Sequence, residues 1–342
     1  MATTDATANF EEIFSLVHSL PGPDQQAADQ VRARELELTK PPGALGRLED
    51  LAEWLATWQG HHPPRVGRAR VAVFSGNHGV AKHGVSAYPS TVTAQMVKNF
   101  RRGGAAVNQL CALMDAELNV YEMALDQPTG DILFEPAMSE EECARSISYG
   151  MMAVEDGLDV ICLGEMGIAN TTSAAALCLA LFGGTAQDWT GPGTGVIGSQ
   201  LDVKTTIVAD AIKLHAPFLE NPLEILRHLG GHELAAIVGA IIAARMARVP
   251  VILDGYASTA AAAVIHKIAD GGLDHVIVGH LSAEPGHTRL LEQIGKKPIL
   301  DLGMRLGEAS GAVLALSLVR SAAACHGGMA TFAEAGVSKK KP

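Results

Sequence analysis

The chain contains 342 residues with a mass of 35.7 kDa, enough for roughly two domains or for one large α/β domain with an appendage. Hydrophobic residues make up 48% of it, which excludes a largely disordered protein, and only 4% are aromatic, so the core must be aliphatic. The formal charge of -11 argues against nucleic acid or an anionic membrane as a partner, because either requires a basic face.

Residues 1–65 have a largely helical pattern and end in the sequence QGHHPP, which we take as the boundary of an N-terminal helical region. Over residues 66–330, short apolar runs alternate with longer alanine-rich stretches. This alternation predicts an α/β domain with a mostly parallel sheet and helices on both faces, in a Rossmann-like arrangement. Residues 331–342 are expected to form a C-terminal tail ending in lysines.

Six runs in the α/β region are apolar on both faces and are predicted to be strands. They are 71–75, 118–122, 159–163, 250–254, 275–279 and 298–302. The stretches between and after them have the pattern of helices. They are 92–114, 140–155, 171–181, 203–215, 233–247, 257–269 and 308–325.

Cysteine usage and the N-terminus bear on location. The five cysteines are scattered and form no CxxC pair, which is typical of a reducing compartment and predicts a cytoplasmic protein. The first residues lack the basic region and apolar run of a secretory signal. The most apolar stretch, 234–253, is interrupted by two arginines and a proline, so it predicts a buried helix and a strand rather than a membrane span.

Glycine-rich polar turns follow five of the predicted strands. They are GNHG at 76–79, GEMGIANTT at 164–172, GYAST at 255–259, HLSAEPGH at 280–287 and GMRLGEASG at 303–311. Ligands of open parallel sheets bind beyond the carboxyl ends of the strands. We therefore expect these turns to converge on one site, where small residues let the backbone approach a ligand closely.

Two of these regions could bind an anion. Asn170, Thr171 and Thr172 open a helix whose free amides and hydroxyls could hold a phosphate, and the alternative is ordinary capping of that helix by Asn or Thr. A second glycine-rich loop at 191–195 matches no dinucleotide or ATP motif, so neither cofactor is expected. Lys204 follows this loop and could supply a charge to the phosphate, although an exposed surface lysine is the common case.

Paired carboxylates suggest acid–base chemistry at the same edge. Glu308 precedes the last long helix, where the helix dipole alone could account for it, or where it could act as a general base. Glu165 has the equivalent position on another strand end. Two such carboxylates suit proton abstraction combined with charge stabilisation.

Histidines give weaker signals. His78 and His83 bracket a glycine-rich loop and, with Ser86, Tyr88 and Gln95, could line a pocket for a flat heterocycle. For each histidine alone, a structural hydrogen bond is the alternative. A zinc motif of the HExxH type is excluded at 232–236 because the second histidine is replaced by alanine, so no metal is expected.

Taken together, the motifs resemble those of the nicotinate-nucleotide–dimethylbenzimidazole phosphoribosyltransferase family. They are TKPPGALGRLE at 39–49, GNHGV at 76–80, SAYPS to QM at 86–96, GEMGI at 164–168, NTT at 170–172 and LGEASG at 306–311. Each motif is weak alone, but they occur in the family's order and span nearly the whole chain. Ala169 is a departure, because the family often has glycine there, and its methyl group is expected to narrow the approach of a phosphate slightly.

The resemblance implies transfer of the 5-phosphoribosyl group of nicotinate mononucleotide to 5,6-dimethylbenzimidazole or a related base, which supplies the lower ligand of cobalamin. It assigns the role of general base to Glu308 and that of second active-site carboxylate to Glu165. Phosphate and ribose binding falls to Gly167, Asn170, Thr171, Thr172, Lys204 and Ser282, and base binding to Ser86, Tyr88, Gln95 and Leu306.

The resemblance also implies a homodimer, no metal or cofactor, and a small helical domain built from both chain ends. Two alternatives remain open from the residues. One is a nicotinate mononucleotide hydrolase, in which water replaces the base, and the other is a non-catalytic nucleotide- or base-binding protein. The pair formed by Glu165 and Glu308 argues against the second, because pure binding does not need two carboxylates.

Overall fold

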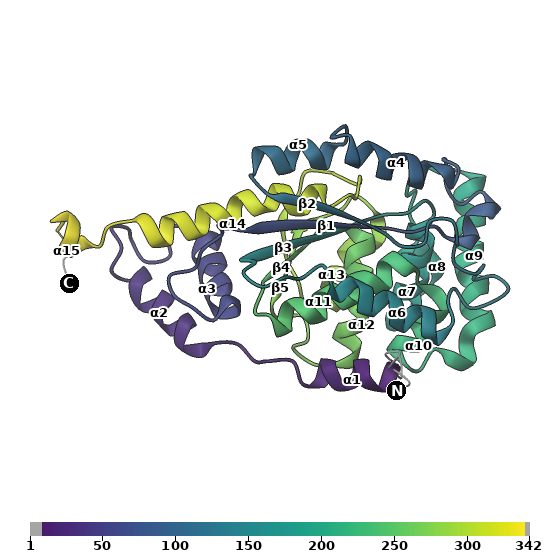
Figure 1. The fold of residues 1–342 in the computed structure, drawn as a ribbon, viewed down its shortest axis with the longest axis horizontal. Coiled ribbons are helices and arrows are strands. Elements are labelled where there is room, and N and C mark those ends of the chain that lie inside the picture. Colours follow the sequence, from purple (N-terminus) through teal and green to yellow (C-terminus); the bar gives the residue numbers. More distant parts are fainter. Residues whose placement is uncertain (1–8, 339–342) are drawn as a thin grey trace, which may run out of the picture.

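The computed structural model describes residues 9–338, in which six parallel strands form one sheet in the order β2-β1-β3-β4-β5-β6 (Figure 1). The strands are β1 (Ala69–Ser75), β2 (Glu117–Glu122), β3 (Val160–Met166), β4 (Val251–Leu253), β5 (Val276–His280) and β6 (Pro298–Leu300). Each overlaps one of the predicted runs. The central strands β1 and β3 are almost completely buried, as the two-sided apolar pattern requires.

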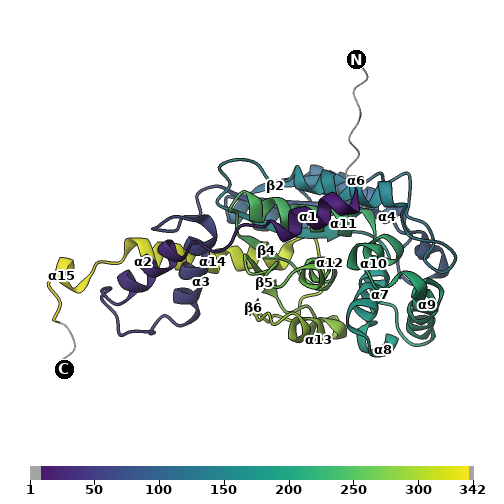
Figure 2. The same cartoon turned by 90° about the horizontal axis from the view of Figure 1, so that it is seen from below.

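Helices cover both faces of the sheet, which confirms the predicted α/β architecture (Figures 1 and 2). One face packs against α4 (Thr91–Arg101), α5 (Ala106–Leu113) and α14 (Ser310–Gly328). The other packs against α6 (Glu140–Met151), α11 (His232–Met246) and α12 (Tyr256–Ile268). The two apolar cores lie between the sheet and these two layers.

The remaining helices extend the layers and the chain ends. They are α1 (Phe10–His18), α2 (Gln25–Glu35), α3 (Arg47–Gln59), α7 (Asn170–Phe182), α8 (Ala186–Trp189), α9 (Ser199–His215), α10 (Pro222–Leu229), α13 (Pro285–Gln293) and α15 (Phe332–Ala335), with 3-10 turns η1 (Gly79–His83) and η2 (Ala216–Phe218). The helix predicted over 92–114 is in fact two helices, because Gly103 adopts φ 78° and ends the first.

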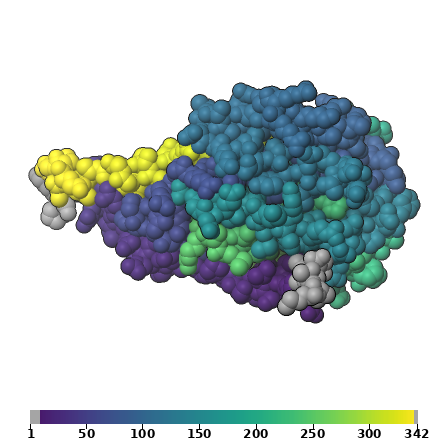
Figure 3. All heavy atoms as spheres, in the orientation of Figure 1, coloured from purple at the N-terminus to yellow at the C-terminus, as the bar shows by residue number. Residues whose placement is uncertain are grey.

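Both chain ends contribute to an arm that projects from the rounded body (Figures 1 and 3). We define this arm as α2, α3, the C-terminal half of α14, and α15. The motif at 39–49 lies in it, and its Lys40 pairs with Glu35 and Glu49 at 2.8 Å each. By contrast, α1 packs on α6 and α12, so the first 65 residues serve both parts. The last lysines of the tail lie outside the described residues.

No helix within residues 9–338 combines the length and the apolar character that crossing a lipid bilayer requires.

Candidate active site

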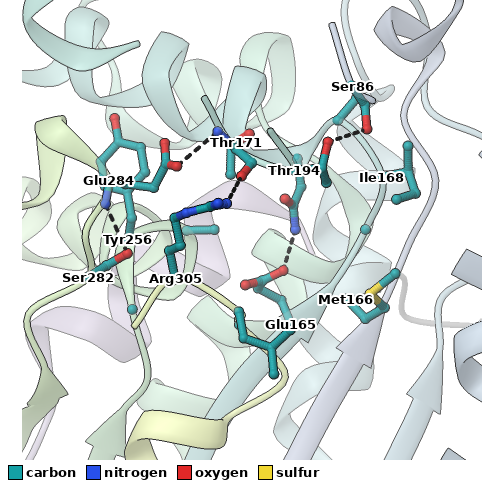
Figure 4. A pocket seen from close by; sticks show the side chains of 18 of the residues that line it. Ser86, Glu165, Met166, Ile168, Thr171, Thr194, Tyr256, Ser282, Glu284 and Arg305 are labelled. Atoms are coloured by element: carbon teal, nitrogen blue, oxygen red, sulfur yellow. Dashed lines mark hydrogen bonds between the residues drawn. The ribbon is translucent and has the colours of Figure 1, made fainter. Parts of the chain in front are cut away.

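A cavity of about 370 Å³ opens at the carboxyl edge of the sheet (Figure 4). Its walls come from the segments that follow β1, β3, β4, β5 and β6, together with the loop before α9. The strand order reverses between β1 and β3, and the carboxyl side of such a switch point is where doubly wound sheets bind ligands. Four of the five glycine-rich turns thus converge on the cavity, whereas the GNHG turn at 76–79 does not line it.

Most of the residues expected at the site line this cavity. They are Ser86, Tyr88, Glu165, Gly167, Asn170, Thr171, Ser282 and Leu306. Four others do not form its wall. Gln95 lies exposed on α4, Thr172 and Lys204 are fully buried behind the wall, and Glu308 is buried next to the lining residue Gly307.

Glu308 stands in an unusual backbone turn just before α14. Gly307, Glu308 and Ala309 have φ values of 83°, 64° and 61°, so three consecutive residues occupy the left-handed region. For the two residues that carry a Cβ this conformation costs about 1–2 kcal/mol each. The amide of Glu308 donates to the carbonyl of Glu165 at 3.0 Å, which ties the turn to the end of β3. Such strained conformations persist where the surroundings enforce them.

The electrostatic surroundings of Glu308 favour a base that works near neutral pH. Its side chain is buried, and no described residue donates a hydrogen bond to the carboxylate. Burial and, after it, the charge of Asp254 raise the pKa of Glu308 to about 7. Burial thus outweighs the helix dipole, which would lower this pKa. A general base is most effective when its pKa lies close to the working pH.

Glu165 differs from Glu308 in its partner. Its carboxylate accepts a hydrogen bond from the side-chain amide of Asn170. Burial raises the pKa of Glu165 to about 8 although the Asn170 contact opposes it, and the charges of Asp254, Glu233 and Glu308 raise it further. At neutral pH Glu165 is therefore mostly protonated, so most of the negative charge of the pair resides on Glu308 and the pair does not carry two charges.

The start of α7 lines the cavity and has no side-chain cap. Its N-cap residue is Ala169, and no side chain caps the helix, so the capping alternative for Asn170 and Thr171 is wrong. Ala169 has φ 79°, a left-handed conformation that glycine adopts without strain, which accounts for glycine at this place in the family motif. Asn170 instead bonds Glu165, and the Thr171 hydroxyl accepts from Lys204.

Lys204 is a buried cation directly behind the cavity wall, not an exposed surface lysine. Its Nζ donates to Thr171 Oγ1 at 2.8 Å and to the carbonyl of Gly191 at 2.9 Å. Burial lowers the pKa of Lys204 to about 8, and the charge of Glu284 opposes this shift. Lys204 therefore remains mostly protonated at pH 7 and brings positive charge to the Thr171 end of the cavity.

Glu284 and Arg305 complete this end of the site (Figure 4). A carboxylate oxygen of Glu284 accepts from the amide of Gly193 at 2.8 Å, and the guanidinium of Arg305 donates to the carbonyl of Gly193 at 2.9 Å. Both side chains line the cavity. Sequence reasoning quoted the turns that contain them but gave them no role, because charged residues in turns are usually solvated.

Two further lining residues, Thr194 and Tyr256, were also missed. Thr194 lies on the Ser86 side of the cavity, and Tyr256 lies beside Glu284 and Ser282 (Figure 4). The hydroxyl of Thr194 lies 2.7 Å from that of Ser86, which fastens the loop before α9 to the segment after η1. Tyr256 donates from its hydroxyl to the carbonyl of Trp189 at 2.8 Å and presents its ring to the cavity. Nothing in the sequence distinguished these residues from others in the same loops.

The histidines that could have lined a heterocycle pocket are structural. His78 is buried, with Nε2 2.6 Å from Glu233 and Nδ1 3.1 Å from Ser173. His83 contacts Asp131 at 2.7 Å. Neither lines the cavity, so the structural alternative holds for both. Among the described residues there is also no group of three or more His, Cys, Asp or Glu side chains placed to hold a metal ion.

Comparisons with known proteins agree with the geometry. A family model described as Phosphoribosyltransferase matches residues 20–337. Nicotinate-nucleotide–dimethylbenzimidazole phosphoribosyltransferases of Sinorhizobium medicae and Rhizobium meliloti are each 56% identical to the chain, over 97% of its length and 98% of theirs. The chain belongs to this phosphoribosyltransferase family.

A solved structure extends the likeness to three dimensions. The crystal structure of the nicotinate-nucleotide–dimethylbenzimidazole phosphoribosyltransferase from Thermus thermophilus superimposes with a TM-score of 0.86 at 41% identity. The match covers 92% of this chain and 99% of that one. The fold is thus shared over 92% of the chain.

Proposed function

We propose that the protein transfers the 5-phosphoribosyl group of nicotinate mononucleotide to 5,6-dimethylbenzimidazole or a related base. The observation that carries this proposal is Glu308, a buried carboxylate with a pKa of about 7, held at the edge of a cavity that Arg305 lines and that has Lys204 directly behind its wall. Membership of the phosphoribosyltransferase family supports the same reaction. Its product, α-ribazole 5′-phosphate, would serve as the lower-ligand precursor of cobalamin.

The nucleotide would bind with its phosphate towards the Thr171 end. There Lys204 and Arg305 supply positive charge, and Gly167, Asn170 and Ser282 offer polar groups beside it. The acceptor base would lie towards Ser86, Tyr88 and Leu306, where the cavity wall is less charged. This placement separates the anionic end from the aromatic end of the two substrates.

The proposed step is a single displacement at C1′ of the ribose. Glu308 takes the proton from one nitrogen of the imidazole ring while the lone pair of the other nitrogen attacks C1′. The C1′–N bond to nicotinate breaks, and its electron pair neutralises the pyridinium nitrogen of the leaving group. Attack opposite the leaving group converts the β-nucleotide into an α-product. Holding both reactants in line is worth about 7–11 kcal/mol of the barrier.

Glu165 contributes to this step according to its protonation state. Ionised, it would stabilise the positive charge that develops on the ribose, as carboxylates do in glycoside cleavage. With a pKa of about 8 it supplies that charge fully only in alkaline solution, and near pH 7 it shares one negative charge with Glu308.

The test is the variant Glu308→Gln, which keeps the shape of the side chain and removes the base. We expect unchanged binding of nicotinate mononucleotide by calorimetry and a loss of kcat of about 100-fold or more, the usual contribution of a general base. Unchanged kcat would remove Glu308 from the mechanism.

Release of nicotinate with and without added dimethylbenzimidazole separates transfer from hydrolysis. Base-dependent release identifies a transferase, whereas equal release without the base identifies the hydrolase. Binding without release under either condition identifies a non-catalytic protein.

The assembly and location proposals rest on surface features. Tyr88, Leu302 and Leu306 are each more than half exposed although they are large and apolar, and they lie at or near the mouth of the cavity. Exposed apolar side chains of this kind support the homodimer expected from the family resemblance, in which a second copy would bury them. All five cysteines are free thiols, which supports a cytoplasmic location.

A further inference from the structure

Behind the cavity wall lies a buried carboxylate, Asp254, directly after β4. It is completely inaccessible to solvent and does not line the cavity. Its Oδ1 accepts hydrogen bonds from the amides of Gly311 at 2.7 Å and Ala312 at 3.1 Å. These are free amides in the first turn of α14, two and three residues beyond the strained backbone of Ala309.

The other oxygen of Asp254 has a different environment. Oδ2 is buried and has no hydrogen-bond partner among the described residues. A carboxylate left partly unsatisfied in the interior is costly, so its charge must be offset by something other than direct hydrogen bonds. The dipole of α14 supplies part of the compensation.

His280, at the end of β5, is the second group that compensates the negative charge of Asp254. Its Nε2 lies 3.5 Å from Oδ1 of Asp254, and its Nδ1 is 3.1 Å from the carbonyl of Leu281. Because the carbonyl requires a proton on Nδ1, only the doubly protonated ring presents N–H to Asp254 as well. Burial alone would lower the pKa of His280, but the contact with Asp254 outweighs it and the pKa is raised.

Glycines make this contact possible. A Cβ on Gly311 would stand 1.9 Å from Cδ2 of His280, and one on Gly279 would stand 2.8 Å from Cα of Ala312. The start of α14 is therefore pressed against β5 and the His280 ring. Asp254 and His280 hold the helix that immediately follows Glu308.

We propose that Asp254 and His280 form a positioning pair that fixes the turn carrying Glu308 and the charge distribution beside its carboxylate. The inference rests on the proposed function of Glu308. Although His280 lines the cavity and Asp254 does not, in this role both act through Glu308 and not on the substrate. Asp254 acts through its hydrogen bonds to the amides of α14 and through its negative charge. The His280 ring, placed beside Asp254, reduces the effect of that charge on the Glu308 carboxylate.

The ionisable groups around Glu308 are few. Glu165 approaches from β3, Asp254 from β4 and His280 from β5, while Arg305 on the same loop is directed to Gly193. Of these, Asp254 is the neighbour whose charge raises the pKa of Glu308. We therefore expect removal of the Asp254 charge to lower this pKa, and loss of the His280 ring, which faces Asp254 at 3.5 Å, to raise it.

The experiment compares the pH dependence of kcat/KM for nicotinate mononucleotide and dimethylbenzimidazole in wild type, D254N and H280Q. D254N keeps an oxygen to accept the amides of α14. Because Glu308 must be ionised to act, we expect the acid limb to move to lower pH in D254N and to higher pH in H280Q, by at least about half a pH unit each. A merely structural anchor would lower stability without displacing the limb in opposite directions.

The matched control is D159N. Asp159 is also buried and also accepts two backbone amides, those of Gly67 and Arg68 at 2.8 Å each, but it lies at the opposite end of the sheet. Its acid limb should coincide with that of wild type. An unmoved limb in D254N, displacement in the same direction in both pair variants, or an equal displacement in D159N would overturn the inference.

Folding and function are tested separately. Should D254N fail to fold in a thermal unfolding assay, H280Q decides alone, and an acid limb that does not move to higher pH refutes the pair. A wild-type protein that shows no base-dependent release of nicotinate refutes the proposed function instead, before any variant is compared.

Discussion

Glu308 shows how a single residue acquires its chemistry from its surroundings. A free glutamate has a pKa near 4.3 and is a weak base at neutral pH. Here burial and the nearby Asp254 raise the pKa to about 7, and the left-handed turn fixes where the carboxylate stands. The strain and the raised pKa have one origin, namely enclosure by β3, β4 and α14.

The raised pKa of Glu308 predicts the pH profile of the wild-type protein. In the proposed reaction the ionised form of Glu308 is the active one, so the acid limb of kcat/KM should rise with pH through a midpoint near 7. The measurement is the initial rate of nicotinate release from about pH 5 to about pH 9, a range that brackets the expected midpoint. A midpoint near the ordinary glutamate pKa would mean that the carboxylate is solvated during turnover.

At the residue scale the sequence predicted chemical identity better than environment. Both carboxylates and eight of the residues that line the cavity were expected from the motifs. The burial of Lys204 and the unexpected wall residues Glu284 and Arg305 were not, because their positions depend on contacts between loops far apart in the chain. In the sequence, Asp254 was only the last residue of a predicted strand. A buried carboxylate at this position is stabilised by the free amides at the start of α14, and the sequence does not show that this helix lies against it.

At the scale of elements, the junction between β3 and α14 brings the catalytic turn to the sheet. Gly164 in β3 lies so close to Ala309 that a Cβ at this position would stand 2.1 Å from the Ala309 amide nitrogen. The obstacle is backbone on both sides, so no side-chain rotation can relieve it. The strand must therefore carry glycine here for the helix to begin where it does.

Gly164→Ala should displace the start of α14. We expect a loss of about 2–3 kcal/mol in the free energy of unfolding, the range for an overpacked core, together with a fall in kcat because the Glu308 turn moves. Chemical denaturation and steady-state kinetics measure the two effects.

The control is Gly327→Ala near the other end of α14, where no atom lies within 4 Å of the added methyl group. It should be neutral or stabilising by up to about 1 kcal/mol, because alanine favours the helix. If both substitutions had the same effect, the contact between Gly164 and Ala309 would not matter.

The element pattern was readily predictable because each strand is a short apolar run between glycine-rich turns. The errors have local causes. The helix expected over 92–114 hid a break at Gly103, and α8, α10 and α13 are too short to show a clear helical period. Strand order was not predictable, because periodicity does not say which strands are neighbours.

At the scale of the whole molecule, the arm and the apolar residues near the cavity mouth are unusual for a monomer. Tyr88, Leu302 and Leu306 are 56%, 58% and 55% exposed. Exposed apolar side chains gathered in one region mark interaction surfaces more often than free surface. The motif at 39–49, far along the arm, has no contact with the cavity of its own chain.

The protein should therefore sediment as a dimer, at twice the chain mass of 35.7 kDa. Analytical ultracentrifugation at several concentrations checks this expectation. Leu302→Glu should shift the equilibrium towards single chains, whereas Leu113→Glu, which replaces an even more exposed leucine on α5, should not. A species of 35.7 kDa at every concentration would exclude the dimer.

Helix α14 runs from the Glu308 turn to the arm and contains 19 residues, which makes it about 28 Å long. A small change in the direction of this helix at one end therefore moves the other end by a much larger distance. A tilt of about 5° around one end carries the other end through about 2.5 Å, and a misplacement of about 1 Å is enough to slow an oriented reaction about 100-fold. A molecule that binds the terminal helices and tilts α14, such as an antibody fragment, would therefore displace Glu308 and slow the proposed proton transfer without touching the cavity.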